Sequence, residues 1–310
     1  MSTNDATSIE RGQAWARYLD DGFQEFTAIG APSNGLRLLA MGDSWFDYFP
    51  VFDVLDALRR KYGYAVSSVA VLGAYLTAMA PPSPGSWDPA NPPPLPPSGR
   101  GEQLYKFIKL VAKLSPEEKS ATKAVLLSGG GNDVAADSRV LASLLNPKGS
   151  GLPPLNDDAV RRVVDADLRG VLTEVLAAIT EISRKYFGRV VPVLIHGYAH
   201  PVPDGRGAGF GAWLRPVLVD MGYTELQDGA DIMAKLIDRL NLMQMQLLAD
   251  NAVALAHVTH VDVRPTLNSV LANDAYKLSW QNELHPTRPA GFIAVADRMQ
   301  RALLVVPNPP

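Results

Sequence analysis

The residues best suited to chemistry in this sequence are Gly42-Asp43-Ser44, which follow an apolar run from Leu36 to Met41 containing a single arginine. Such a run predicts a buried strand, and the glycine permits a tight turn at its end. The turn leaves a serine at the carboxyl edge of the predicted sheet, where open α/β folds bind ligands. Ser44 could be a nucleophile if a base reaches it, or an ordinary cap of the next helix.

Three further segments fit the same chemistry. Gly73 directly follows the second predicted strand, and a third apolar run leads into Ser128-Gly129-Gly130-Gly131-Asn132-Asp133. Near the end of the chain lies Asn282-Glu283-Leu284-His285-Pro286-Thr287. Acyl transfer needs a nucleophile, a base that takes its proton, and donors for the developing oxyanion. His285, in a loop just before the last predicted helix, is the candidate base.

In this order, the segments resemble the sequence blocks of the SGNH (GDSL-type) hydrolase family. These blocks are Gly-Asp-Ser, an isolated glycine, Gly-x-Asn-Asp and a late Asp-x-x-His. The resemblance extends from about Leu36 to Ala296, and therefore over most of the chain. It implies that the oxyanion is bound by the backbone N–H groups of Ser44 and Gly73 and by the side-chain amide of Asn132.

One position departs from the family pattern, because Asn282 stands where the blocks have an aspartate. The third member of a triad holds the histidine tautomer and stabilises imidazolium, and asparagine supplies no charge. Three hypotheses follow. Ser44 and His285 act as a dyad oriented by Asn282, or Glu283 or Asp262 replaces the missing acid, or the protein is a weak enzyme or none.

The aromatic residues after Ser44 have two interpretations. Trp45, Phe46, Tyr48 and Phe49 could wall an acyl pocket, or they could pack in the core. Core packing is the usual place for large aromatic side chains.

Several other site classes are disfavoured. The sequence contains no Gly-x-Ser-x-Gly elbow, no P-loop and no His-Glu-x-x-His pattern. It has no cysteine, which excludes disulfides and thiolate chemistry. We therefore expect no cofactor and no metal.

Strand and helix patterns alternate along the chain. Apolar runs predict further strands at Ala65–Leu72, Ala124–Leu127, Val190–Ile195 and Val258–Val263, although Pro192 interrupts the fourth strand of the series. Helical periodicity predicts helices that follow Pro50, that run from Asn156 to Gly188 and from Asp228 to Asp250, and that cover Ala290–Leu304. This alternation predicts a mostly parallel sheet covered on both faces. The resemblance implies the same flavodoxin-like three-layer αβα sandwich.

We expect a single domain over residues 1–310 with two embellishments. Residues of about 1–35 form a helical extension, and Pro81–Pro97 form an insert with nine prolines that can be neither helix nor central strand. The insert could shield the site, or it could be a ligand for a partner that binds polyproline.

Composition narrows the partners. With 47% hydrophobic and 20% charged residues and a formal net charge of −3, the chain has no general field that would attract nucleic acid. Neither a signal-peptide pattern nor an apolar run long enough to span a membrane is visible, so a cytoplasmic protein is expected.

The favoured hypothesis is a serine esterase or acyl hydrolase that acts on a small-molecule ester through an acyl-enzyme intermediate. Two rivals remain. One is an SGNH-like binding protein for an ester, lipid or carbohydrate that has little or no catalytic power. The other is an interaction module that acts through the proline-rich insert.

Overall fold

A five-stranded parallel sheet forms the centre of the molecule. The computed structural model describes residues 34–48, 52–81, 99–207 and 211–309. The strands are β1 (Arg37–Met41), β2 (Ala65–Ser68), β3 (Thr122–Ser128), β4 (Val193–His196) and β5 (Val258–Val261), in the order β2-β1-β3-β4-β5. Every neighbouring pair is parallel. This is the doubly wound order of flavodoxin-like folds, whose ligand crevice lies where β1 and β3 diverge.

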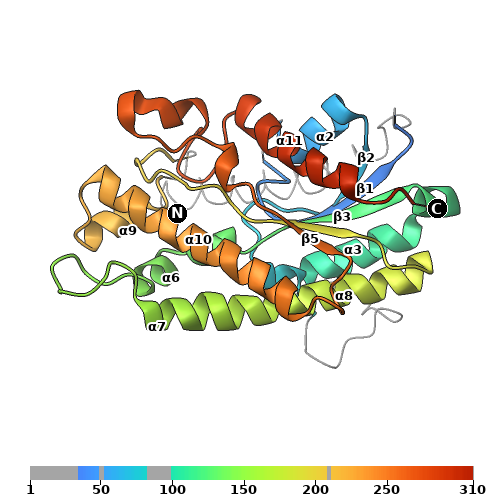
Figure 1. Ribbon diagram of the computed structural model, residues 1–310, viewed down its shortest axis with the longest axis horizontal. Coiled ribbons are helices and arrows are strands. Elements are labelled where there is room, and N and C mark those ends of the chain that lie inside the picture. The colour runs from blue at the N-terminus through green and yellow to red at the C-terminus, as the bar shows by residue number, and fades with distance from the viewer. Residues whose placement is uncertain (1–33, 49–51, 82–98, 208–210, 310) are drawn as a thin grey trace, which may run out of the picture.

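Helices cover both faces of the sheet. Helices α2 (Val54–Tyr62) and α11 (Ala290–Val305) lie on one face, while α3 (Glu102–Lys113), α8 (Arg169–Phe187) and α10 (Leu226–Asp250) lie on the other (Figure 1). The shorter helices are α4 (Pro116–Ser120), α5 (Gly131–Ala135), α6 (Ser138–Ser143), α7 (Asp157–Val160) and α9 (Arg215–Asp220). The three-layer αβα architecture predicted from the alternation of elements is therefore confirmed.

The first described helix begins later than the sequence suggested. Asp53 caps α2 by accepting a hydrogen bond from the Asp56 amide at 2.9 Å. Pro50, which was expected in the first turn, lies outside the described residues. Gly63 ends the helix in a left-handed conformation with φ of +73°, which glycine adopts readily.

The segment predicted to be helical from Asn156 to Gly188 forms one continuous helix. The Asn156 side chain caps it at the Ala159 amide, and Gly188 ends it with φ of +64°. Between α7 and α8 the turns of Arg161–Leu168 widen into a π-helix. This helix buries one apolar stripe, as the spacing predicted.

Two strands differ from their predicted bounds for a clear reason. The fourth begins at Val193 rather than Val190, because Pro192 has no N–H to donate and contributes only its carbonyl, which accepts from Val125. The second ends at Ser68, although Val69 and Val71 still donate to the carbonyls of Ala40 and Gly42. The chain therefore stays beside β1 up to the loop that contains Gly73.

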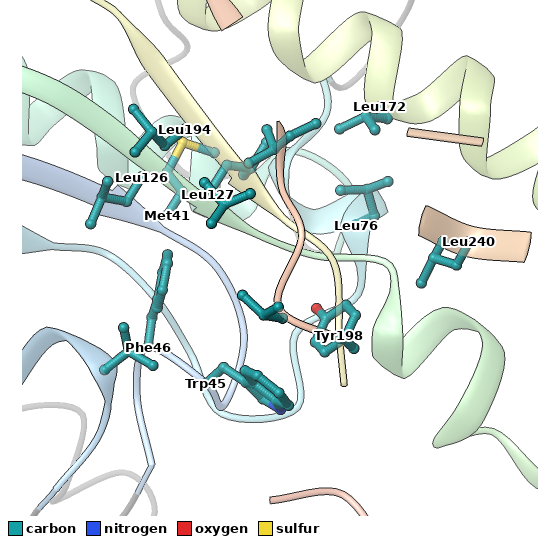
Figure 2. Close-up of a cluster of buried hydrophobic side chains, with 14 of the residues drawn as sticks. Met41, Trp45, Phe46, Leu76, Leu126, Leu127, Leu172, Leu194, Tyr198 and Leu240 are labelled. Carbon is teal, nitrogen blue, oxygen red and sulfur yellow. The ribbon is translucent and has the colours of Figure 1, made fainter. Parts of the chain in front are cut away.

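The core beneath the site is closely packed. Leu38, Leu39, Ala40 and Met41 have no exposed surface, which is expected of a strand covered on both faces. Figure 2 shows Met41 of β1 near Leu126 and Leu127 of β3 and Leu194 of β4.

Part of the sequence prediction lies outside the described residues. This applies to the helical extension of about 1–35, except its last residues, and to the insert at 81–97, except Pro81. Among the helices that the structure does describe, none is long and apolar enough to cross a membrane.

Candidate active site

The turn that carries Ser44 is held by a glutamine from α3, on the face of the sheet away from α2 (Figure 1). Gln103 of α3 is buried, and its side chain accepts from the Gly42 N–H at 2.6 Å and donates to the Gly42 carbonyl at 2.9 Å. A Cβ at Gly42 would lie 2.8 Å from Cβ of Ser128. The ends of β1 and β3 thus approach so closely that only glycine fits.

Asp43 fixes the same turn from inside. One carboxylate oxygen accepts from the Trp45 N–H at 3.1 Å and from the Ser128 hydroxyl at 2.7 Å, and the other accepts from the Tyr198 hydroxyl. Burial, and then the charge of Asp43, raise the pKa of Tyr198 well above its usual value. Tyr198 is therefore a permanent donor, and the carboxylate ties together the ends of three strands.

Ser44 and His285 meet at this edge, although 241 positions separate them in the chain. The Ser44 Oγ lies 2.8 Å from Nε2 of His285, and both residues are about 5% exposed. The other ring nitrogen, Nδ1, lies 3.0 Å from Oδ1 of Asn282. Because a carboxamide oxygen only accepts, Nδ1 carries the proton and Nε2 offers its lone pair to the serine hydroxyl.

The orientation of the Asn282 amide is set by its other contacts. Its oxygen also accepts from the N–H groups of Leu284 and His285 at 3.0 and 2.9 Å. Its nitrogen donates to the Tyr48 hydroxyl at 3.0 Å. If the amide were flipped, its NH₂ group would face the N–H groups of Leu284 and His285, and no hydrogen bond could form. Asn282 therefore holds one tautomer of His285 without carrying a charge.

His285 stands among aromatic rings and near a cation. The Tyr48 ring stacks on its imidazole with centroids 4.1 Å apart, and Trp213 meets it edge-on at 5.9 Å. The guanidinium carbon of Arg288 lies 5.2 Å from the centre of the Tyr48 ring. Burial, and secondarily the charge of Arg288, lower the pKa of His285 to about 3. The imidazole is therefore neutral at ordinary pH.

Asn132 links the β3 loop to the loop that contains Gly73. Its amide nitrogen donates to the Ala74 carbonyl at 2.9 Å, and the next residue, Asp133, accepts from the Leu76 N–H at 2.9 Å. Burial raises the pKa of Asp133 to about 6. The Asn132 amide has a second hydrogen, and its residue lines the same hollow as Ser44.

Gly73 occupies an exposed turn with φ of +75°, which few other residues would adopt. Asp47 supports this turn by accepting from the Leu72 N–H at 3.1 Å. Gly73 does not line the hollow beside Ser44; it lines a neighbouring hollow of about 280 Å³. Within the described residues, no hydrogen bond occupies the Gly73 N–H. Of the three donors that the resemblance implied, Gly73 is the one that does not line the hollow shared by Ser44 and Asn132.

Glu283 does not contact the His285 ring, which corrects its suggested role as an orienting acid. Its side chain is fully buried and turns toward the loop before α9. There its two oxygens accept at 2.7 to 3.0 Å from four backbone N–H groups, those of Gly205, Trp213, Leu214 and Arg215. Glu283 therefore holds the segment that places Trp213 beside the base.

Asp262 is also occupied elsewhere. Its carboxylate binds the Arg264 side chain at 2.9 and 2.8 Å and the Arg264 N–H at 3.0 Å. Bonding to Arg264 lowers the pKa of Asp262 despite its partial burial. Among the described residues, Nδ1 of His285 therefore has Asn282 as its partner and no carboxylate.

A small hollow opens between Ser44 and Asn132. Its volume is about 30 Å³, and its walls include Trp45, Tyr198 and Leu284. Across the described residues, no cluster of three or more histidine, aspartate or glutamate side chains could hold a metal ion. The arrangement is that of a serine hydroxyl hydrogen-bonded to a neutral imidazole beside a confined space.

Sequence reasoning gave no role to several side chains that build this site, among them Gln103, Tyr198 and Ser128. Tyr198 and Ser128 bind Asp43, and their only signal was their place at the carboxyl ends of β4 and β3. His196, at the carboxyl end of β4, is fully buried and stacks on Trp45 with centroids 5.5 Å apart. Burial lowers its pKa, and the residue packs beneath the site.

No family model matches this sequence, and no curated protein matches it. Solved structures do resemble it. A phospholipase A1 from Streptomyces albidoflavus is 16% identical with a TM-score of 0.48, and 88% of this chain and 99% of that chain are covered. A GDSL-like lipase from Bacteroides thetaiotaomicron is 13% identical with a TM-score of 0.42, and the coverage is 94% and 97%.

A third similar structure is a variant of Axe2, an acetyl-xylooligosaccharide esterase from Geobacillus, which is 13% identical with a TM-score of 0.41. The comparison covers 89% of this chain and 96% of that chain. Another of the similar chains is described as an SGNH hydrolase. These chains are similar to this one at 13–16% identity, and its fold is defined by the strand order and layers described above.

The four bonds to Glu283 generate a stability prediction. Glu283→Gln keeps the shape but turns an amide toward backbone donors, so buried N–H groups lose their acceptor. Each such loss costs about 1–3 kcal/mol, and we expect the free energy of unfolding to fall by about 2–5 kcal/mol. Urea denaturation measures it.

The matched control is Glu181→Gln on the exposed side of α8, where the side chain is 55% exposed. We expect it to change stability by less than about 0.5 kcal/mol. An equal loss of unfolding free energy in both variants would contradict a stabilising role for the four hydrogen bonds that Glu283 accepts.

Proposed function

We propose that this protein hydrolyses carboxylic esters, with Ser44 as nucleophile and His285 as general base. The observation that carries the proposal is the 2.8 Å contact between Ser44 Oγ and the unprotonated Nε2 of His285. A serine hydroxyl is a weak nucleophile until a base within hydrogen-bond reach takes its proton. Asn282 supports the proposal, because it keeps Nε2 free to accept.

In the first half of the reaction, the Ser44 oxygen bonds to the ester carbonyl carbon as its proton moves to Nε2 of His285. The carbonyl oxygen becomes an oxyanion, for which the second N–H of Asn132 and the backbone N–H of Ser44 are the nearest candidate donors. The C–O bond to the alcohol then breaks, and the alcohol leaves with the proton from His285. An acyl group remains on Ser44.

In the second half, water attacks the acyl carbon and gives its proton to Nε2 of His285. The bond to Ser44 breaks, the serine recovers the proton, and the carboxylic acid leaves. Gly73 joins as a donor only if substrate binding brings its turn closer to Ser44. Its free N–H and its bond-supported turn are consistent with that role, since catalytic donors often align only with substrate bound.

Asn282 affects the rate rather than the course of the reaction. In a triad the acid holds the tautomer and stabilises imidazolium. The Asn282 amide supplies only the first of these, and Arg288 opposes the second. We therefore propose a working but slow esterase.

Removal of the nucleophile tests the proposal directly. Ser44→Ala should reduce hydrolysis of p-nitrophenyl acetate by about 10³-fold or more and abolish labelling by a fluorophosphonate probe. Mass spectrometry of the labelled peptide reports the site. Ser143→Ala, an exposed serine on α6, is the matched control and should keep both. Labelling that persists in Ser44→Ala would place the reactive residue elsewhere, and no labelling of the parent together with a rate unchanged by the substitution would favour a binding protein instead.

Restoration of the family's acid tests the role of Asn282. In Asn282→Asp the carboxylate can accept the same N–H bonds, and its charge should raise the pKa of His285 by about 1–2 units. We expect kcat/KM to rise about 10- to 100-fold, which is the imidazolium stabilisation that such a shift represents.

The control for this substitution is Asn268→Asp. Asn268 is exposed, and its side-chain oxygen also accepts a local N–H bond, from Val270. We expect no change in rate. If Asn282→Asp also leaves kcat/KM unchanged, then imidazolium formation does not limit turnover.

The pH profile follows from the environment of His285. The base works in its neutral form, and its pKa near 3 means that it takes up a proton only far below its usual range. After subtraction of the Ser44→Ala background, kcat/KM should therefore be level within about twofold between pH 5 and 8. A fall centred near pH 6.5 would mean that the imidazole is not held in this buried, cation-flanked state.

A further inference from the structure

The hollow beside Ser44 is the place where part of a substrate must fit. It measures about 30 Å³ and is bordered by both Ser44 and Asn132. One water-sized group needs roughly 10–15 Å³ by this kind of measure, so the space suits only a few heavy atoms. Besides its carbonyl oxygen, the ester carbon attacked by Ser44 carries an acyl group and an alcohol, and at most a small one of these two can enter here.

The walls of the hollow are fixed by hydrogen bonds. The Trp45 indole N–H donates to the Leu284 carbonyl at 3.1 Å, and the Tyr198 hydroxyl donates to Asp43. The two rings meet edge to face with centroids 5.2 Å apart. Figure 2 shows Trp45 and Tyr198 near each other. To widen the hollow, a substrate would have to break one of these bonds or move a buried ring.

The remaining lining is equally firm. A Cβ on Gly131 would lie 2.7 Å from the Tyr198 ring, which therefore has no room to swing in that direction. Ile237 borders the hollow from α10 and is 3% exposed. Close-packed interiors yield little to an extra methylene group.

The substituent that occupies a narrow hollow with fixed walls is the one that stays. The alcohol must depart before water can attack, whereas the acyl group remains bonded to Ser44 through both halves of the reaction. We propose that this hollow is an acyl pocket of acetyl size, so that the protein removes acetyl groups and rejects longer acyl chains. This inference rests on the esterase function proposed above and narrows its substrate to short-chain acyl esters.

The test compares two ester series. With p-nitrophenol constant, kcat/KM should fall by at least about 100-fold from acetate to octanoate, since chains that do not fit lose transition-state binding. With acetate constant, replacement of p-nitrophenol by larger phenols of similar leaving ability should change kcat/KM by less than about tenfold. Equal turnover of acetate and octanoate, or a strong dependence on the alcohol alone, would overturn the proposal.

Substitution of Ile237, which lines the hollow, makes the test specific. Ile237→Ala should enlarge the hollow and raise the ratio of butyrate to acetate kcat/KM by about tenfold. Ile232→Ala removes the same atoms from the same buried helix away from the hollow and should leave the ratio unchanged. Should Ile237→Ala fold poorly, Ile237→Val provides a smaller change with the same sign. An unchanged ratio in a folded Ile237 variant would overturn the pocket assignment.

The two proposals fail in different ways. If fluorophosphonate labels Ser44 and short and long esters react equally, only the acyl-size inference is wrong. If Ser44 is not labelled and every ester is untouched, the esterase function itself is wrong, and the inference falls with it.

Discussion

The site depends on the hydrogen bond that joins Ser44 to His285. It connects the loop after the first strand with the loop before the last helix, and each end is held independently. Asp43 and Gln103 fix the serine turn, while Asn282 fixes the imidazole. A contact between two loops is precise only when both are supported, because an unsupported loop samples many positions and the geometry of attack tolerates little error.

That support comes from buried polar side chains whose partners are mostly backbone groups. Gln103 satisfies Gly42, Glu283 satisfies the segment before α9, and Asp133 satisfies Leu76. Loops carry backbone N–H and C=O groups that no helix or sheet pairs, and a buried side chain is a compact way to pair several at once. These bonds hold the loops at the carboxyl edge of the sheet in place without extra secondary structure. Much of the wall of the hollow beside Ser44 belongs to these loops and is held in place with them.

The sequence was informative wherever function constrains local spacing. The order of strands and helices followed from periodicity. Ser44 and Asn132 were singled out from short motifs at strand ends, and His285 from a motif before the last predicted helix. The direction of a side chain within a motif did not follow. Glu283 and Asn282 are neighbours in one loop, yet one faces the backbone of another segment and the other faces His285.

Which neighbour faces the imidazole is decided by tertiary contacts that no local pattern encodes. The same holds for Tyr198, whose partner Asp43 lies 155 positions away.

The asparagine at position 282 can be explained by the energetics of burial. An aspartate there would bury a charge close to His285, and desolvation of an ion costs several kcal/mol unless a cation compensates. Arg288 lies near Tyr48 and bonds Gln281, so it opposes imidazolium without being paired to Asn282. A neutral amide avoids the desolvation cost and still fixes the tautomer through the same N–H bonds. For the esterase proposed above, stability of the fold and stabilisation of the transition state therefore oppose each other at this position, and the asparagine favours stability.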